Sequence, residues 1–291
     1  MFTEWVGYRT IPETIAEKPG NEKVRYAMLL TDNDKLEFAE RGYIVVPAVL
    51  SRPEIDAATG VIDDLIAETP PPDGHRGHHF YWAALEPGHP LLRLVRDGTA
   101  LDVAEQLIRP GRLEVPRQAQ IALNIPPHPH RPGRGHLDGA TPPEPDGRPG
   151  TFTVLAGLML TDQTLENAGN LWVWPGTHRT HEAYFRERGP DALLPARGLP
   201  DITLPAPKQV LGRAGDLLLA HYMLGHNIGG NTSPNVRRAV YYRLRREGHR
   251  DRWRDCLQDV WLEFDAIRAA QVRRDPLLAP NDSGVGNAQR R

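Results

Sequence analysis

The sequence of 291 residues predicts a β-sandwich or barrel buttressed by N-terminal helices. Segments with helical periodicity come first along the chain. Short runs rich in β-branched residues, separated by turn residues, follow after Pro110. The 27 glycines and 28 prolines exceed the average share and are typical of a chain with many turns. The length allows one large β domain with appendages as readily as two domains.

Composition excludes several classes of protein. The chain has 35 Lys and Arg against 37 Asp and Glu, so it has no general attraction for nucleic acid or anionic membranes. A single cysteine, Cys256, excludes an intrachain disulfide and a cysteine-based zinc site. No apolar run is long enough to span a bilayer, and the N-terminus lacks a secretory signal, so we expect a cytoplasmic protein.

The periodicity of the sequence assigns elements along most of the chain. Helix starts are marked by Thr31 and by the capping pair Ser51 and Glu54. The expected elements are a helix from Thr31 to Gly42, a strand at Tyr43–Val46, a helix from Ser51 to before Pro70, a Pro/Gly/His loop at 70–80, a helix at about 90–108, strands at Gln118–Ile125, Thr151–Leu160, Asn170–Trp174, Asp216–Tyr222 and Arg237–Leu244, and a last helix at about 251–270.

Two histidine segments suggest a metal centre. His136 and Asp138 are two residues apart, so at the end of a strand their side chains can point to one side. With a distant histidine they would form the facial triad of a non-haem Fe(II) oxygenase, which leaves three metal positions open. Alone, the His-x-Asp pattern is weak, because loop histidines beside capping aspartates are common. His226 lies 90 residues downstream and supplies the third ligand.

An arginine follows the third histidine at an informative distance. Arg237 comes 11 residues after His226, beyond a turn rich in Gly, Asn and Pro. A hairpin there could return Arg237 to the same pocket. A guanidinium binds a carboxylate through two parallel hydrogen bonds, which is what the far end of 2-oxoglutarate requires.

With these motifs the chain resembles the phytanoyl-CoA dioxygenase-like (PhyH) family of Fe(II)/2-oxoglutarate-dependent oxygenases, which includes ectoine hydroxylase. The resemblance covers roughly residues 31–246, and residues 38–55 and 169–179 are further landmarks. It implies a mainly β fold, a double-stranded β-helix (the cupin-like jelly roll) with flanking N-terminal and C-terminal helices. We expect an N-terminal extension at 1–30, one oxygenase domain at 31–275 with its jelly-roll core at about 113–246, and a flexible tail at 276–291.

The resemblance also implies roles for residues. His136, Asp138 and His226 would bind Fe(II), and Arg237 with Ser233 would bind the far carboxylate of 2-oxoglutarate. Gln120 and Asn124, four apart on one strand, would face the co-substrate pocket. Two departures from the family pattern are Asn227, in place of a common Gly, and Ile228, where relatives often have a small polar residue.

The implied reaction converts 2-oxoglutarate and O₂ to succinate and CO₂ and hydroxylates, or otherwise oxidises, a C–H bond of a small molecule of specialised metabolism. Family halogenases have Ala or Gly at the position of Asp138, so hydroxylation is favoured over chlorination. A Zn(II)-dependent hydrolase and a non-catalytic jelly-roll binding module are the alternatives. The sequence specifies neither the substrate nor the oligomeric state.

Several residues have competing interpretations. His221 competes with His226, but it lies inside an apolar strand and is favoured as a packed histidine. Arg238 competes with Arg237, although only one of two adjacent strand residues can enter the pocket. Loop or turn positions are expected for His75, His78, His79, His128, His130 and His178.

Three residues are candidates for contact with the substrate. Tyr241 shares the strand face of Arg237, and Trp172 could stack on a substrate, although core packing is the more common role of such a residue. Arg134, beside the first metal ligand, could steer an anionic group. The eight arginines from 237 to 254 are interleaved with acidic residues and are interpreted as a solvated face.

Overall fold

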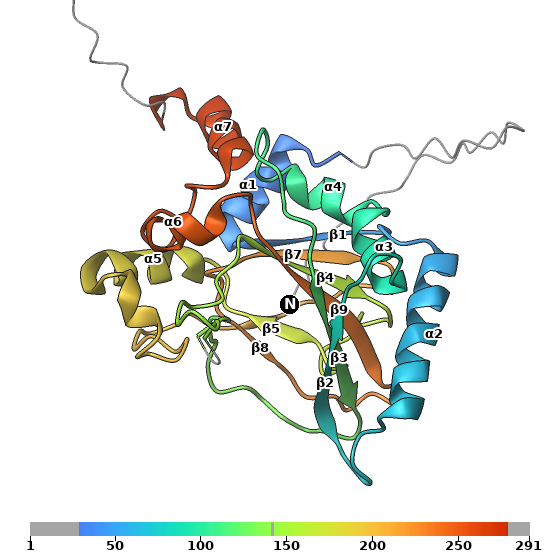
Figure 1. The fold of residues 1–291 in the computed structure, drawn as a ribbon. Helices are drawn as coiled ribbons and strands as arrows, with labels where there is room; N and C mark the ends of the chain where they lie inside the picture. Colours follow the sequence, from blue (N-terminus) through green and yellow to red (C-terminus); the bar gives the residue numbers. More distant parts are fainter. Residues whose placement is uncertain (1–28, 141–142, 279–291) are drawn as a thin grey trace, which may run out of the picture.

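Two antiparallel sheets form the centre of the molecule, and helices surround them (Figure 1). The computed structural model describes residues 29–140 and 143–278. The major sheet has the order β1 (Tyr43–Val46), β7 (Leu217–His221), β4 (Val154–Met159), β9 (Arg237–Leu244), β3 (Gln118–Ile125) and β2 (Gly77–Ala84). The minor sheet has the order β6 (Lys208–Gln209), β5 (Leu171–Val173) and β8 (His226–Ile228).

The two faces of the major sheet have different partners, because successive side chains of a strand point to opposite faces. One face carries Ile121, Val240 and their neighbours and packs against the helices α1, α2, α3, α4 and α7 in one hydrophobic core. The other face carries Leu155, Leu218 and Tyr241 and packs against the minor-sheet residues Leu171 and Val173. The second face is therefore the interior of a two-sheet barrel.

The expected N-terminal helix starts are present. α1 (Asp32–Arg41) begins with a capping box between Thr31 and Asp34, and α2 (Arg52–Glu68) begins with one between Ser51 and Glu54. Gly42 ends α1 with φ of 80°, a conformation that favours glycine. A Cβ atom at Gly42 would also lie 2.6 Å from Nδ1 of His178, so the position admits no side chain.

Two expected long helices are each divided in two. The segment 90–108 forms α3 (Pro90–Arg96) and α4 (Ala100–Glu105), separated at Gly98, where a Cβ atom would collide with the carbonyl oxygen of Leu94. The C-terminal segment forms α6 (His249–Gln258) and α7 (Asp265–Arg274). Between them Asp259 is extended, and its carboxylate accepts a hydrogen bond from the backbone of Trp261, which closes a turn.

Strands β2, β6 and β8 and helix α5 were not expected from the sequence. The segment interpreted as a Pro/Gly/His loop continues into strand β2, so His78 and His79 are strand residues. Helix α5 (Thr177–Arg188) follows β5, so His178 lies in a helix rather than a turn. Helices account for 32% of the described residues, and strands with isolated bridges for 22%, so the expectation of a mainly β protein is corrected to a mixed one.

The start of the expected jelly-roll core also differs from the structure. Strands β1 and β2 belong to the major sheet and precede residue 113, where the core was expected to begin. Short 3₁₀ helices occur at Pro190–Leu193 and Pro276–Leu278. The expected extension at 1–30 and tail at 276–291 lie almost entirely outside the described residues. Among the helices that the structure describes, none has both the length and the apolar character needed to cross a membrane.

Candidate active site

Backbone pairing places two histidines side by side at the edge of the minor sheet. His226 is the first residue of β8, and His136 forms an isolated antiparallel bridge with it. The amide of His136 donates to the carbonyl of His226 at 3.0 Å, and the amide of His226 donates back at 3.2 Å. The imidazole centroids are 4.7 Å apart, and Asp138 follows two residues after His136.

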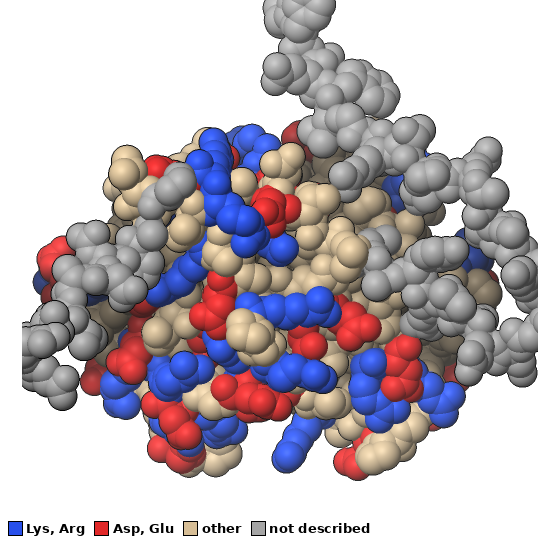
Figure 2. Space-filling model, turned by 90° about the horizontal axis from the view of Figure 1, so that it is seen from above, with Lys and Arg blue, Asp and Glu red and all other residues tan. Residues whose placement is uncertain are grey.

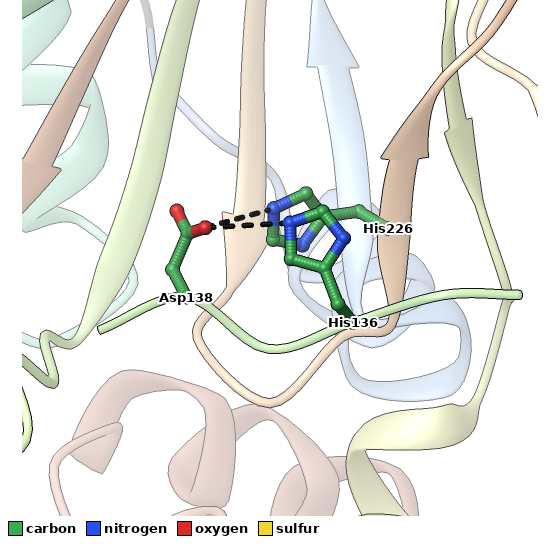
Figure 3. A group of neighbouring side chains, drawn as sticks. All are labelled: His136, Asp138 and His226. Carbon is green, nitrogen blue, oxygen red and sulfur yellow. Dashed lines mark ion pairs between the residues drawn. The ribbon is translucent and has the colours of Figure 1, made fainter. Parts of the chain in front are cut away.

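The three side chains converge on one point (Figure 3). Oδ1 of Asp138 is 3.5 Å from Nε2 of His136 and 3.7 Å from Nε2 of His226. Nδ1 of His226 is 3.1 Å from the carbonyl of Leu224 and donates to it, so Nε2 is the ring nitrogen that faces Asp138. Two imidazole nitrogens and one carboxylate oxygen on one side of a point are the donor set that suits non-haem Fe(II).

An arginine orients the carboxylate of this triad. Arg243 donates to Oδ2 of Asp138 from Nε at 3.0 Å and from Nη2 at 2.7 Å, which leaves Oδ1 for the histidines. Burial alone would raise the pKa of Asp138, but the hydrogen bonds of His136 and His226 and the charges of His226 and Arg243 hold it well below its usual range. Burial lowers the pKa of His136. The triad thus offers an ionised oxygen, as metal binding requires.

Arg237 lies on the same strand face as Arg243 but has no acidic partner among its hydrogen-bond acceptors. Its side chain is buried, with 2% of its surface exposed. Nε donates to the side-chain oxygen of Gln163 at 3.2 Å, Nη1 donates to the carbonyl of Ala122 at 3.3 Å, and Nη2 donates to the hydroxyl of Tyr241. All three acceptors are neutral, and a buried cation is costly unless an anion accompanies it. The position is therefore suited to the carboxylate of a small ligand.

Unpaired polar atoms lie close to Arg237. Nε2 of Gln163 and Oδ1 of Asn124 are buried without a hydrogen-bond partner, and Asn124 is directly opposite Arg237 in the β3–β9 register. Nε1 of Trp172 is also buried without a partner and adjoins Gly229, whose carbonyl accepts from Asn124. Buried polar atoms without partners are rare in folded proteins and mark places where a ligand or water completes the bonding.

The structure places the other expected site residues as follows. Gln120 faces the interior and accepts from Arg243 at 3.1 Å, so it contacts the triad's arginine rather than Arg237. The hydroxyl of Ser233 bonds Asn231 and the carbonyl of Asn235 within its own turn and is not brought to Arg237. Arg134 is exposed and donates to the carbonyl of Pro200.

The competing histidines have other surroundings. His221 is buried, is 2.8 Å from the carbonyl of Val260 through Nε2, accepts from the amide of Met223 and stacks on Phe264. Burial lowers its pKa to about 4. His178 is packed against His221 and the carbonyl of Ala39. The rings of His128 and His130 stack on each other beside His78, and none of these belongs to the triad.

The arginines from 237 to 254 do not form a single solvated face, which corrects the sequence-based interpretation. Arg237 and Arg243 point into the interior, because alternate residues of β9 do so. The others are paired with acids: Arg238 with Asp63, Arg245 and Arg250 with Glu144, Arg246 with Asp265, Arg252 with Glu263, and Arg254 with Asp191. Figure 2 shows the same interleaving of basic and acidic side chains on the face that it views.

A comparison with protein families decides the assignment. Residues 38–239 match the model of the phytanoyl-CoA dioxygenase (PhyH) family. The chain belongs to this family. The resemblance expected from the sequence is thereby confirmed, and so, at the level of the PhyH family, are an Fe(II)/2-oxoglutarate-dependent oxygenase enzyme and the cofactors iron and 2-oxoglutarate.

Solved structures with a similar fold include those of three proteins. The non-heme alpha-ketoglutarate-dependent carbocyclase SnoK from nogalamycin biosynthesis is 22% identical, over 78% of this chain and 92% of that chain, with a TM-score of 0.55. HygX from Streptomyces hygroscopicus, with nickel and 2-oxoglutarate bound, is 19% identical, over 73% of this chain and 86% of that chain, with a TM-score of 0.50. The epimerase SnoN from nogalamycin biosynthesis is 19% identical, over 72% of this chain and 79% of that chain, also with a TM-score of 0.50.

This structural similarity shows that the protein has the jelly-roll-like fold of 2-oxoglutarate oxygenases. No match is found among curated proteins.

Two residues of the candidate site were not predicted from the sequence. Arg243 lies two and six positions after Tyr241 and Arg237, so strand periodicity places it on their face, but it was grouped with the surface arginines. Gln163 follows β4 in a connection whose path across the sheet no local pattern predicts. Its only signal is a polar residue shortly after a continuous apolar strand.

Proposed function

We propose that the protein is an Fe(II)/2-oxoglutarate-dependent dioxygenase that hydroxylates, or otherwise oxidises, a C–H bond of a small molecule. The observation that carries the proposal is the combination of the two features on one barrel interior. A triad of metal-ligand side chains and a buried arginine whose hydrogen-bond acceptors are all neutral belong to the same barrel interior. Neither feature alone indicates this chemistry, but an α-keto dicarboxylate needs both a metal and a distant cation.

Each residue then has a distinct task. His136, Asp138 and His226 would hold the iron, and Arg243 fixes Asp138 in one orientation through two hydrogen bonds. Arg237 would bind the far carboxylate of 2-oxoglutarate, with the free amide group of Gln163 as a further donor. When bound, iron and 2-oxoglutarate supply the oxidation itself, in which O₂ and 2-oxoglutarate give succinate and CO₂ as the substrate is oxidised.

Asp138 supports oxidation rather than halogenation, because its carboxylate occupies the ligand position that a halide would need. Natural-product metabolism is our proposal for the setting. The structural likeness to SnoK and SnoN, which come from nogalamycin biosynthesis, is consistent with it and leaves the substrate open.

Succinate formation tests the proposal against the two alternatives. Protein supplied with Fe(II), 2-oxoglutarate and O₂ should form succinate, and removal of O₂ or replacement of Fe(II) by Zn(II) should stop it. A Zn(II) hydrolase would form no succinate but would hydrolyse its substrate under both changes, and a binding module would form no succinate and no product. Either result would overturn the proposed function.

A further inference from the structure

The buried guanidinium of Arg237 is held in one position by three protein acceptors. It donates to the side-chain oxygen of Gln163, to the carbonyl of Ala122 and to the hydroxyl of Tyr241. A guanidinium has five N–H donors, so two remain for a ligand. Because the group is fixed, it can bind a carboxylate only where these two donors point.

Tyr241 is the acceptor that shows in which direction the guanidinium extends. Arg237, Tyr241 and Arg243 share one face of strand β9, and Arg243 binds the triad residue Asp138. Ala239, between Arg237 and Tyr241 on this face, has a short side chain, and the guanidinium carbon of Arg237 is 5.4 Å from the centroid of the Tyr241 ring. The guanidinium therefore extends along the strand toward Arg243, and the Tyr241 hydroxyl fixes how far it reaches.

The hydroxyl of Tyr241 also keeps a proton for a ligand. It accepts from Arg237 and donates to no protein atom among the described residues. A hydroxyl that accepts from a cation becomes a stronger donor. Nε2 of Gln163, the other side chain bonded to Arg237, is likewise buried without an acceptor. These unpaired donors surround one guanidinium, where the two oxygens of a carboxylate can accept from several of them.

Strand β4, the neighbour of β9 in the major sheet (Figure 1), provides the space for the Tyr241 ring. Gly157 is directly opposite Tyr241 in the β4–β9 register. A Cβ atom at Gly157 would lie 2.6 Å from Cε1 and 2.9 Å from Cδ1 of Tyr241, whereas the next neighbour, Cβ of Leu218, would be 3.6 Å away. Gly157 has no positive φ, so its backbone would admit another residue. The Tyr241 ring is therefore what requires a glycine at this position.

We propose that Tyr241, packed against Gly157, fixes the reach of Arg237 and donates to the far carboxylate of the bound 2-oxo acid, so that the site selects the five-carbon dicarboxylate over its four-carbon and six-carbon homologues. The proposal rests on the proposed function, which supplies the metal at the other end of the co-substrate. A metal and a cation that are both fixed in place accept only one spacing between a 2-oxo acid group and a distant carboxylate. Tyr241 then serves the co-substrate rather than the molecule that is oxidised.

Anaerobic titration of the Fe(II) protein with oxaloacetate, 2-oxoglutarate and 2-oxoadipate tests the proposal, with the iron–ketoacid absorption band as the measure of binding. The wild type should bind 2-oxoglutarate at least about tenfold more tightly than either homologue. Tyr241→Phe removes only the hydroxyl and should weaken 2-oxoglutarate binding about tenfold. The preference over 2-oxoadipate should shrink at the same time, because Arg237 is no longer held at one reach. A merely structural role of Tyr241 would leave this preference unchanged.

Gly157→Ala tests the contact behind Tyr241. It should weaken 2-oxoglutarate binding as Tyr241→Phe does, because the added methyl group displaces the ring. In Tyr241→Ala the ring is absent, so the further change Gly157→Ala should alter the affinity by less than about twofold. Gly60→Ala in helix α2 is the matched control and should change nothing, since a Cβ atom there meets no atom within 4 Å.

The two proposals fail in different ways. Absence of the band with all three acids in the unmodified protein contradicts the proposed function. A normal band with unchanged affinity in Tyr241→Phe, or with an equal loss for every acid, overturns the role of Tyr241. Equal losses from Gly157→Ala with and without the Tyr241 ring overturn the role of Gly157. Circular dichroism of each variant at the assay temperature verifies that folded protein is titrated.

Discussion

Two groups of three side chains in the described part of the chain bring possible metal-ligand atoms within 4.8 Å of one another, and they have opposite characters. In the first group, His136, Asp138 and His226, the ligand atoms face one another (Figure 3). The second group, His249, Cys256 and Glu263, lies between β4 and the C-terminal helices. The ligand atoms are therefore equally close together in the two groups, but the groups differ in whether these atoms are already hydrogen-bonded to protein.

In the second group the ligand atoms are already bonded to protein. Nδ1 of His249 is 2.8 Å from Glu263, and its Nε2 is 2.9 Å from the hydroxyl of Thr151. The Glu263 carboxylate also accepts from Thr153 at 2.6 Å. Burial raises the pKa of the Cys256 thiol, which keeps it protonated and a poor ligand. A metal would have to break this network, so we interpret the group as a structural polar cluster.

The largest expected effect is a loss of activity when a histidine of the first group is replaced. His226→Gln should reduce succinate formation to background, because the triad loses a ligand, while the melting temperature stays within a few degrees of the wild type. His221→Gln is the control at the competing histidine and should retain turnover per folded molecule. Near-normal turnover in His226→Gln would show that the first group is not the metal site.

The next largest effect is a loss of stability when a histidine of the second group is replaced. His249→Ala should lower the free energy of unfolding by about 3 kcal/mol, because it removes the nearer of the two basic partners of the buried Glu263 carboxylate. Turnover per folded molecule should be unchanged. Arg254→Ala, which removes an exposed ion pair with Asp191, should cost less than about 1 kcal/mol in the same denaturation experiment. A stable, inactive His249→Ala protein would reverse the assignment of the two groups.

A smaller effect is expected for Arg237, the buried cation of the proposed 2-oxoglutarate site. Arg237→Met should weaken 2-oxoglutarate binding by at least about tenfold, because a charge-assisted hydrogen bond contributes about 1.5–3 kcal/mol. Arg237→Lys should restore only part of the affinity, since an ammonium cannot form two parallel bonds.

The adjacent residue provides the matched control for Arg237. Arg238 is bonded to Asp63 on the opposite face, so Arg238→Met should leave the affinity for 2-oxoglutarate unchanged. Titration under anaerobic Fe(II) measures all three variants. A loss confined to Arg238→Met would contradict the strand register.

The smallest effect is a pH dependence of the second group. Burial would raise the pKa of Glu263, but the hydrogen bonds and charges of His249, Thr153 and Arg252 hold it below its ordinary value of 4.5. A carboxyl whose pKa is lower in the folded state stabilises the protein above its unfolded pKa and loses this contribution as the pH falls through the folded value. Unfolding free energy should therefore decline below about pH 4.5, less steeply in Glu263→Gln. Equal slopes in both proteins would remove Glu263 as the cause.

The sequence predicted the parts of this account that depend on local spacing. Short β-branched runs between turn residues placed β1, β3 and β9, and helix-start signals at Thr31 and at Ser51 with Glu54 placed the starts of α1 and α2. The two histidine segments identified the three triad residues as candidate metal ligands. Sequence alone did not predict contacts made across the barrel, such as the partners of Asp138 and Arg237. Arg243 and Gln163 reach these residues through sheet pairing, which no local pattern records. The exposed edge strand β2 was missed because its histidines and glycine resemble a loop.

Anaerobic titration with Fe(II) and 2-oxoglutarate tests the central claim that free ligand atoms, and not proximity alone, make the first group the metal site. The account predicts one iron per chain and an iron–ketoacid absorption band in the wild type and in His249→Gln, and no band in His226→Gln. A band that survives in His226→Gln and disappears in His249→Gln would contradict it.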